Sequence, residues 1–166
     1  NLLFKARDLI ADKTPLIYPI TKDNFEAAIP KIKEKPTPVG VKGNGIEEII
    51  PITKRFKEEG ILDLVIDPSP KSLKEMVRDY TLIRRAALKK TFRPLGYPII
   101  SFPSLMAENR MEEILLASAA VPKYAGIIVL SDFDKATLYP LLVLRQNIYT
   151  DPRVPLAVEQ KIYEIG

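Results

Sequence analysis

The sequence has 166 residues, a length that suits one globular domain of ~100 to 200 residues. Its 25 Lys and Arg residues against 21 Asp and Glu residues give a net charge of +4, a mild excess that does not by itself indicate a nucleic-acid-binding protein. Hydrophobic residues make up 46% and charged residues 28%, which excludes a disordered chain. No apolar run reaches the ~20 residues of a bilayer-spanning helix, so the sequence predicts a soluble globular protein.

The chain contains no cysteine, histidine or tryptophan. These absences exclude disulfides, structural zinc, thiolate ligands of iron-sulfur clusters, Ser-His-Asp triads and histidine general bases. The first ten residues lack the basic start and the apolar core of a secretory signal, so a cytoplasmic location is the expectation. The start at Asn1 instead of Met indicates a piece of a longer polypeptide, or a chain whose first residues are not included.

Five short apolar runs recur along the chain, and each is followed by a segment with helical spacing. The runs are residues 16–20, 38–42, 62–67, 97–102 and 126–130. Their continuous apolarity is typical of strands buried on both faces, as in a parallel sheet covered by helices. The intervals between them are long enough for the crossovers that parallel pairing needs.

Amphipathic spacing predicts one helix before the first run and one after each of the five runs. The first occupies residues 1–11. The second begins after Asp23 and Asn24, and Pro30 lies inside it, where the missing backbone donor should kink the helix. Its inward stripe consists of Phe25, Ala28, Ile29 and Ile32.

The third helix begins at a cap formed by Asn44 or Gly45, ends at Gly60 and should be kinked at Pro51. Its inward residues are Ile49, Ile50 and Phe56. The fourth and longest helix runs from about residue 70 or 71 to Lys90, with basic residues in its last turn that complement the helix dipole. Its apolar face consists of Leu73, Met76, Val77, Tyr80, Ile83 and Ala87. Two further helices are expected over residues 105–120 and 135–144.

One helix followed by five strand-helix units and a tail is the pattern of an α/β protein with a parallel sheet, and two architectures fit it. A complete (β/α)8 TIM barrel has eight strands and ~250 residues, so this chain holds about five eighths of one. A doubly wound sheet of five parallel strands needs no missing part. Length alone therefore favours the doubly wound sheet.

In both architectures function gathers at the carboxyl ends of the strands, so the residues that follow each run are the candidate site. They are Thr21, Lys22 and Asp23; Lys42, Gly43, Asn44 and Gly45; Asp67, Pro68 and Ser69; Ser101, Phe102, Pro103 and Ser104; and Ser131, Asp132, Phe133 and Asp134. These residues define no reaction, so we assign no catalytic residue, no cofactor-binding residue and no metal ligand.

The segment 42–45 lies between a strand and a helix, where backbone donors and the helix dipole could hold an anion. Glu48 stands where a dinucleotide fingerprint has its third glycine, and its charge would repel a pyrophosphate. A tight turn with a helix cap is therefore the favoured interpretation.

Three aspartates also allow two interpretations each. Asp132 and Asp134 could hold Mg²⁺, but capping of the following helix by Asp134 is favoured. Asp67 could act as an acid or base at a barrel mouth, and an Asp-Pro turn with Pro68 explains it as well.

One basic cluster stands out along the chain. It consists of Arg84, Arg85, Lys89, Lys90 and Arg93. No helix-turn-helix, zinc module or aromatic RNA-binding signature accompanies it, so a solvated helix face or a site for an acidic protein partner is favoured over nucleic-acid binding.

Two long strings carry a resemblance to a known family. They are DYTLIRRAALKKTFRPLGYPIISFP at residues 79–103 and LLVLRQNIYTDPRVPLAVEQKIYEIG at residues 141–166. Both resemble the large (gamma) subunit of the corrinoid iron-sulfur protein, found in acetogens and in the acetyl-CoA decarbonylase/synthase complex of methanogens. The resemblance extends upstream through PLIYPITKDNFEAAI and LDLVIDP and covers most of the chain.

The family combines an N-terminal [4Fe-4S] domain, a central TIM barrel and a C-terminal cobamide domain. The resemblance implies that residues 1–145 are part of the barrel, which reverses the preference for a doubly wound sheet. Residues 146–166 would form an extended connector towards a cobamide-binding domain that is not present here. No residue of the cluster motif or the corrinoid pocket carries over, so we expect this segment alone to bind neither cofactor.

The function that the resemblance implies is methyl transfer. The corrinoid would accept a methyl group from a methyl-tetrahydropterin and pass it to acetyl-CoA synthase. The implied partners are the small (delta) subunit, acetyl-CoA synthase and the methyl-tetrahydropterin or its methyltransferase, with no nucleic acid and no membrane. The segment alone is expected not to be catalytic. The alternatives are a free-standing pterin-dependent methyltransferase barrel and a small-ligand-binding α/β module.

Overall fold

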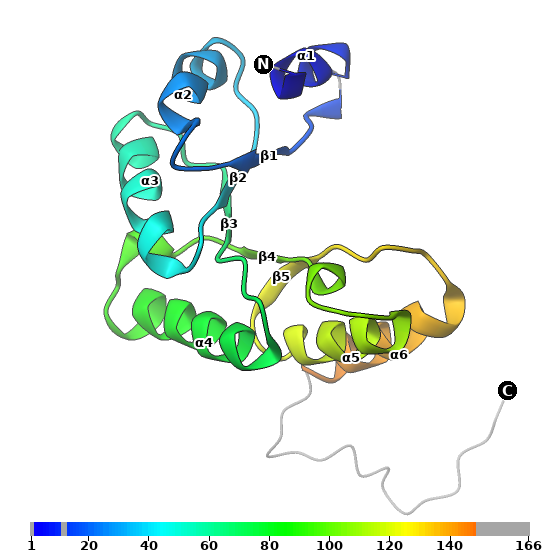
Figure 1. Ribbon diagram of the computed structural model, residues 1–166. Coiled ribbons are helices and arrows are strands. Elements are labelled where there is room, and N and C mark those ends of the chain that lie inside the picture. Colours follow the sequence, from blue (N-terminus) through cyan, green and yellow to red (C-terminus); the bar gives the residue numbers. More distant parts are fainter. Residues whose placement is uncertain (1, 11–12, 149–166) are drawn as a thin grey trace, which may run out of the picture.

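The computed structural model describes residues 2–10 and 13–148, which contain one parallel sheet (Figure 1). Its strands are β1 (Ile17–Ile20), β2 (Val39–Lys42), β3 (Leu64–Asp67), β4 (Ile99–Ser101) and β5 (Ala125–Ile128). Every neighbouring pair is parallel. Each strand overlaps one of the five apolar runs, so the predicted parallel α/β fold is confirmed.

Helices alternate with these strands along the described chain. They are α1 (Leu2–Leu9), α2 (Phe25–Glu34), α3 (Ile46–Glu58), α4 (Leu73–Lys89), α5 (Arg110–Ala120) and α6 (Lys135–Asn147). Each overlaps a predicted helix, and α2 and α3 continue through Pro30 and Pro51. The start of α5 was predicted too early, because Pro103–Leu105 form the short 3-10 helix η3. A second short 3-10 helix, η2 (Arg93–Leu95), precedes β4.

The strands lie side by side in chain order, β1-β2-β3-β4-β5. A crossover between adjacent parallel strands is right-handed, so sequential order places all the crossover helices on the same face of the sheet. Figure 1 shows α2, α3 and α4 following one another along the outside of the strands. A doubly wound sheet has a switch point where the strand order reverses, and the described strands contain none. The order is that of an arc of a (β/α)8 barrel.

The helix that precedes β1 belongs to the same outer layer. Arg7 of α1 is buried, and its guanidinium donates to the carbonyls of Lys31 at 2.7 Å and Lys35 at 3.2 Å. These carbonyls lie at the C-terminal end of α2, where a cation also complements the helix dipole. Arg7 therefore fastens α1 to α2.

One aromatic contact joins strands that are not neighbours in the sheet. Tyr18 of β1 and Phe102, directly after β4, stack with ring centroids 4.8 Å apart. Three strand spacings separate β1 from β4, which is about 14 Å in a flat sheet. The two rings meet on the face of the sheet away from the helices, because the Tyr18 side chain lies across β2 and its hydroxyl reaches Asp67 of β3. We call this face the lumen.

Gly40 of β2 provides the space for this contact. A Cβ atom at Gly40 would lie 2.7 Å from Cδ2 of Tyr18, which is closer than two carbon atoms can pack. The Tyr18 ring thus lies directly over the β2 backbone. A larger residue at position 40 would displace the ring and with it the stacking on Phe102.

The core lies between the helices and the outer face of the sheet. Val41 of β2 and Ile66 of β3 are fully buried there. The helices contribute Ile49, Phe56, Met76, Tyr80 and Ile83, all predicted to face inward. Leu73 was predicted on the inner face of α4 but is 47% exposed, because it lies in the first turn of that helix, ahead of the first buried residue, Met76.

Both outer strands of the described sheet have a free edge, since β1 and β5 each pair with one strand. On β5, Gly126 and Ile127 are exposed, in contrast to the buried residues of β2 to β4. Unpaired edges of this kind are where a further strand can add. Among the described residues, none of the helices combines the length and the apolar character that crossing a bilayer requires.

Replacing Gly40 by alanine tests the close contact between the β2 backbone and the Tyr18 ring. We expect Gly40→Ala to lower the free energy of unfolding by about 1 to 3 kcal/mol, because the added methyl group overpacks against Tyr18. Urea denaturation measures the change. In a Tyr18→Ala background the same substitution should cost much less, and an equal cost in both backgrounds would show that the ring contact is not the cause.

Candidate functional site

The carboxyl ends of β1 to β4 place four side chains around the lumen. Gly40 faces Tyr18, so strand alternation also places Lys42 on the lumen side of β2. Lys42 is in register with Asp67 of β3. Phe102 follows β4 and stacks on Tyr18. We call Tyr18, Lys42, Asp67 and Phe102 the mouth cluster.

Asp67 is the most constrained member of the mouth cluster. Only 2% of the residue is exposed. One carboxylate oxygen accepts from the Tyr18 hydroxyl at 2.6 Å and from the Ser69 hydroxyl at 3.1 Å, and the other accepts from the Ser69 backbone N–H at 2.7 Å. The bond from Ser69 N–H closes an Asx turn around Pro68, in which Ser69 has a φ of 49°. Of the two interpretations left open for Asp67, the structural turn is therefore supported.

Tyr18 is held as the donor of this pair. Burial raises the pKa of Tyr18 above its ordinary value, and the hydrogen bond to Asp67 raises it further. The protonated Tyr18 hydroxyl therefore donates one of the three hydrogen bonds that the Asp67 carboxylate accepts. This pair joins β1 to β3 across Gly40 and offers neither a free base nor a free acid.

The backbone donors of residues 43–45 are all used within the protein. The N–H of Gly43 donates to the Asp67 carbonyl, that of Asn44 to Glu48 Oε2, and that of Gly45 to the Pro68 carbonyl. Gly45, with a φ of 92°, is the N-cap residue of α3. The predicted tight turn and helix cap are confirmed, and the loop donors of residues 43–45 are all used within the protein.

Glu48 and Lys22 add a charged pair at the rim, 2.8 Å apart. The Asn44 N–H, followed by Lys22, holds the pKa of Glu48 below its ordinary value, and Glu48 raises the pKa of Lys22. Thr21 and Asp23 contribute a local turn, in which Asn24 Oδ1 accepts from the Thr21 N–H. These residues order the β1–α2 loop.

The segment 131–134 is fastened to α5. Arg110 pairs with Asp132 at 3.0 Å and with Asp134 at 3.3 Å. Asp134 is the N-cap residue of α6 by position, as predicted, but its side chain makes no cap hydrogen bond, because its carboxylate faces Arg110. The described residues contain no group of three or more His, Cys, Asp or Glu that could hold a metal ion.

Glu113 and Tyr80 were not recognised as important from the sequence. Glu113 is buried in α5 and accepts from both the N–H and the hydroxyl of Ser131. Ser101 was predicted at the strand ends but lies in the core beside Tyr80, and neither hydroxyl has a hydrogen-bond partner among the described residues. Burial raises the pKa of Tyr80 to about 12, and the nearby Ser101 hydroxyl opposes this rise although the two do not meet hydrogen-bond geometry.

A small cavity of about 200 Å³ lies beside the mouth cluster. Asp67, Ser69, Lys71, Phe102 and Met106 are among its walls. The remaining strand-end residues, Pro103 and Ser104, belong to η3 beside this cavity. The cavity is too small for most cofactors, which occupy sites of ~300 to 1,000 Å³.

A family model described as CO dehydrogenase/acetyl-CoA synthase delta subunit matches residues 1–166, the full chain. The chain belongs to this family. It is 44% identical over its full length to the corrinoid/iron-sulfur protein large subunit of Moorella thermoacetica, of which it covers 37%. It is also 33% identical over 93% of its length to subunit gamma 1 of the acetyl-CoA decarbonylase/synthase complex of Methanosarcina mazei, of which it covers 35%.

The resemblance to the large (gamma) subunit that the sequence strings suggested is thereby confirmed. Subunit gamma of Methanopyrus kandleri is a further relative, 30% identical over 95% of this chain and 36% of its own length. The chain thus spans little more than a third of the length of these family members.

The name of the Moorella relative includes a corrinoid and an iron-sulfur group. The present residues do not fit an iron-sulfur cluster, because the chain has no cysteine and the described residues form no metal-binding group. No histidine is available as a nitrogen ligand to cobalt either.

A double-mutant cycle tests the Tyr18–Asp67 pair. We expect Tyr18→Phe to lower the free energy of unfolding by about 1.5 to 3 kcal/mol, because a bond to a buried carboxylate is lost. Adding Asp67→Asn should cost less than the sum of the two single changes by more than about 0.5 kcal/mol, measured by urea denaturation. Tyr139→Phe, at a tyrosine that is 71% exposed, is the matched control and should change little. Additive costs would contradict the pairing.

The two buried tyrosines should differ in their response to removal of the hydroxyl. Tyr80→Phe is expected to be neutral or stabilising at pH 7, because its hydroxyl is buried without a partner. A raised folded-state pKa means that stability is complete below pH 10, the unfolded value, and falls as the pH rises towards about 12. Tyr80→Phe should therefore lose less stability than the parent between pH 10 and 12 in denaturation series. An identical slope would show that Tyr80 does not titrate in this range.

Proposed function

We propose that this chain is the barrel part of a corrinoid iron-sulfur methyl carrier. The complete protein would accept a methyl group from a methyl-tetrahydropterin on its corrinoid and pass it to acetyl-CoA synthase, for acetyl-CoA synthesis or cleavage. The observation that carries the proposal is the match along the entire chain to a large subunit named corrinoid/iron-sulfur protein. The acetyl-CoA decarbonylase/synthase names of the archaeal relatives agree with it.

Within such a carrier the barrel would act as a scaffold. The corrinoid supplies the methyl-transfer chemistry, and the protein positions it. The mouth cluster supports a scaffold role because Asp67 already accepts three hydrogen bonds and the loop donors of residues 43–45 are satisfied. The same saturation does not favour a free-standing pterin-dependent methyltransferase, which would need free polar groups at the mouth to bind its substrate.

The proposal includes an arrangement of the longer polypeptide. Residues 1–145 would be the barrel part, and residues 146–166 would lead to the cobamide-binding domain. Gln146 and Asn147 are the last two residues of α6, and residues 149–166 lie outside the described part. The small subunit and acetyl-CoA synthase would be the protein partners, and the cytoplasm the location.

The experiment uses the complete polypeptide together with its small subunit. Methyl-tetrahydropterin is added to the reduced protein, and the absorption spectrum is followed for conversion of cobalt(I) corrinoid to methylcorrinoid. We expect conversion by the parent and, within about twofold, by Lys42→Ala, because Lys42 makes no ion pair with a described residue and has no proposed role in the chemistry. A general acid or base contributes ~10² to 10⁴ in rate.

Two outcomes would contradict the proposal. Absence of corrinoid from the purified complete protein would remove the carrier function altogether. A loss of ~100-fold or more in Lys42→Ala, with folding unchanged, would instead assign the mouth a direct chemical role. Lys5→Ala, at an exposed lysine of α1, is the matched control for the loss of one charge.

A further inference from the structure

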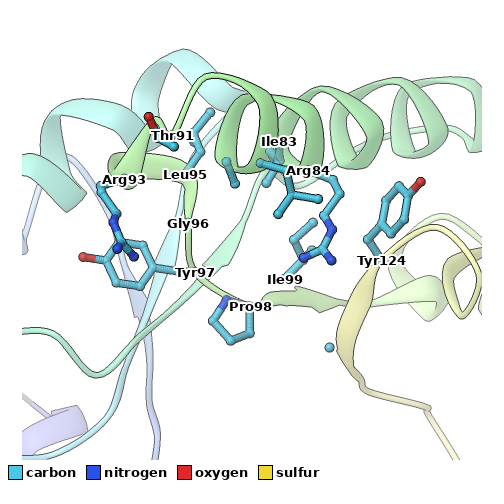
Figure 2. Close-up of a pocket in the computed structure, with 13 residues that line it drawn as sticks. Ile83, Arg84, Thr91, Arg93, Leu95, Gly96, Tyr97, Pro98, Ile99 and Tyr124 are labelled. Atoms are coloured by element: carbon cyan, nitrogen blue, oxygen red, sulfur yellow. The ribbon is translucent and has the colours of Figure 1, made fainter.

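A groove lies at the end of the sheet opposite the mouth cluster. Its volume is about 630 Å³. One wall is the C-terminal half of α4, the second is the segment 91–98 that leads into β4, and the third is the start of β5 (Figure 2). Tyr124 and Gly126 lie opposite α4, and α5 contributes no residue to the lining of the groove. We call this feature the basic groove.

The floor of the basic groove is apolar. It includes Ile83, Leu95 and Ile99, whose side chains are buried. Two large apolar side chains on its walls are exposed, with Leu88 61% and Tyr124 48% accessible. Exposed apolar surface that continues into a concave site is typical of a binding surface.

The rim of the basic groove is positively charged. Arg84 extends from α4 towards Tyr124, with its guanidinium 5.7 Å from the ring centroid, and Arg93 lies beside Tyr97 on the other wall (Figure 2). Further cations flank the groove in sequence, namely Arg85, Lys89, Lys90 and Lys123. None of these six forms an ion pair with a described residue.

The surrounding sequence provides no compensating acid. Residues 80–107 and 114–131 contain neither Asp nor Glu, so the walls carry cations only. Elsewhere in the described chain several cations are paired, as in Lys22 with Glu48 and Arg110 with Asp132. The positive charge on the rim is therefore not neutralised by the described residues and is available to an acidic group from outside them.

The backbone of the basic groove does not suit a small anion such as phosphate. Such sites are built from converging free N–H groups. Here the N–H groups of Phe92, Leu95 and Gly96 donate to the carbonyls of Ala86, Phe92 and Arg93. Arg84 and Arg93 also lie on different walls of the groove, and the Arg84 guanidinium lies over the Tyr124 ring.

We propose that the basic groove docks an acidic segment of a partner protein, which places an apolar side chain on the floor and carboxylates against Arg84 and Arg93. Charge complementarity selects an acidic segment, and the apolar floor selects a peptide with an apolar anchor. The inference rests on the proposed function, which supplies the two candidate partners, the small subunit and acetyl-CoA synthase. It adds to that function the surface of this chain on which one of them binds.

The first test measures affinity. The complete protein, carrying Arg84→Glu and Arg93→Glu, is titrated with each of the two candidate partners, in low and high salt. We expect binding of one partner to weaken by at least about tenfold and to lose part of its salt dependence. Lys74→Glu with Lys135→Glu is the matched control, since both lysines are exposed in first helical turns, and it should bind as the parent does.

The second test identifies the occupant. A photoreactive benzoylphenylalanine replaces Leu88 in the basic groove or, as control, Leu82 of α4, which is 47% exposed but does not line it. Cross-linking at position 88 to an acidic peptide of a partner supports the proposal. Cross-linking to another part of the same polypeptide, or unchanged affinity in the charge-reversed variant, overturns it. If methyl transfer by the parent is intact in that case, the docking inference fails while the proposed function stands.

Discussion

The Tyr18 side chain, which lies across the lumen, is the constraint on which the rest of the structure depends. It extends from β1 over β2, stacks on Phe102 after β4 and so connects strands that are not neighbours in the sheet. Gly40 makes this possible, because its backbone is the surface on which the Tyr18 ring lies. The same ring carries the hydroxyl that bonds to Asp67, so one side chain contacts residues from β1 to the end of β4 and also occupies the carboxylate at the mouth.

The mouth cluster consequently serves stability more than chemistry. A carboxylate at the end of a barrel strand is where catalytic residues are usually found. Asp67 accepts three hydrogen bonds, two of them from a turn that it closes itself. Burial together with these three internal hydrogen bonds is thus the physical reason that position alone did not identify a functional residue.

Local patterns predicted the elements well, and contacts between distant segments could not be predicted. The strands were found because both faces are covered, so each run is continuously apolar. Tyr18 and Asp67 are 49 residues apart, and nothing in either segment shows that β1 and β3 lean together over Gly40. The loop at residues 43–45 resembles an anion site in sequence because it lies between a strand and a helix. Only the fold reveals that its N–H groups donate to the carbonyls of Asp67 and Pro68 and to the Glu48 carboxylate. Ser101 faces the core because strand alternation places it opposite Phe102.

The two ends of the sheet differ in how their charges are balanced. At the carboxyl end Lys22, Asp132 and Asp134 have partners within the described residues, the Asp67 carboxylate accepts three hydrogen bonds, and Lys42 is the mouth cation without an ion pair in the described chain. At the amino end Arg84 and Arg93 have none, and they border exposed apolar surface. Internally paired charges are already compensated before a partner arrives, whereas unpaired cations can still gain interaction energy on binding. In the proposed arrangement, the hydrogen bonds of the mouth cluster hold the carboxyl end of the sheet together, and the basic groove at the amino end is the surface for association.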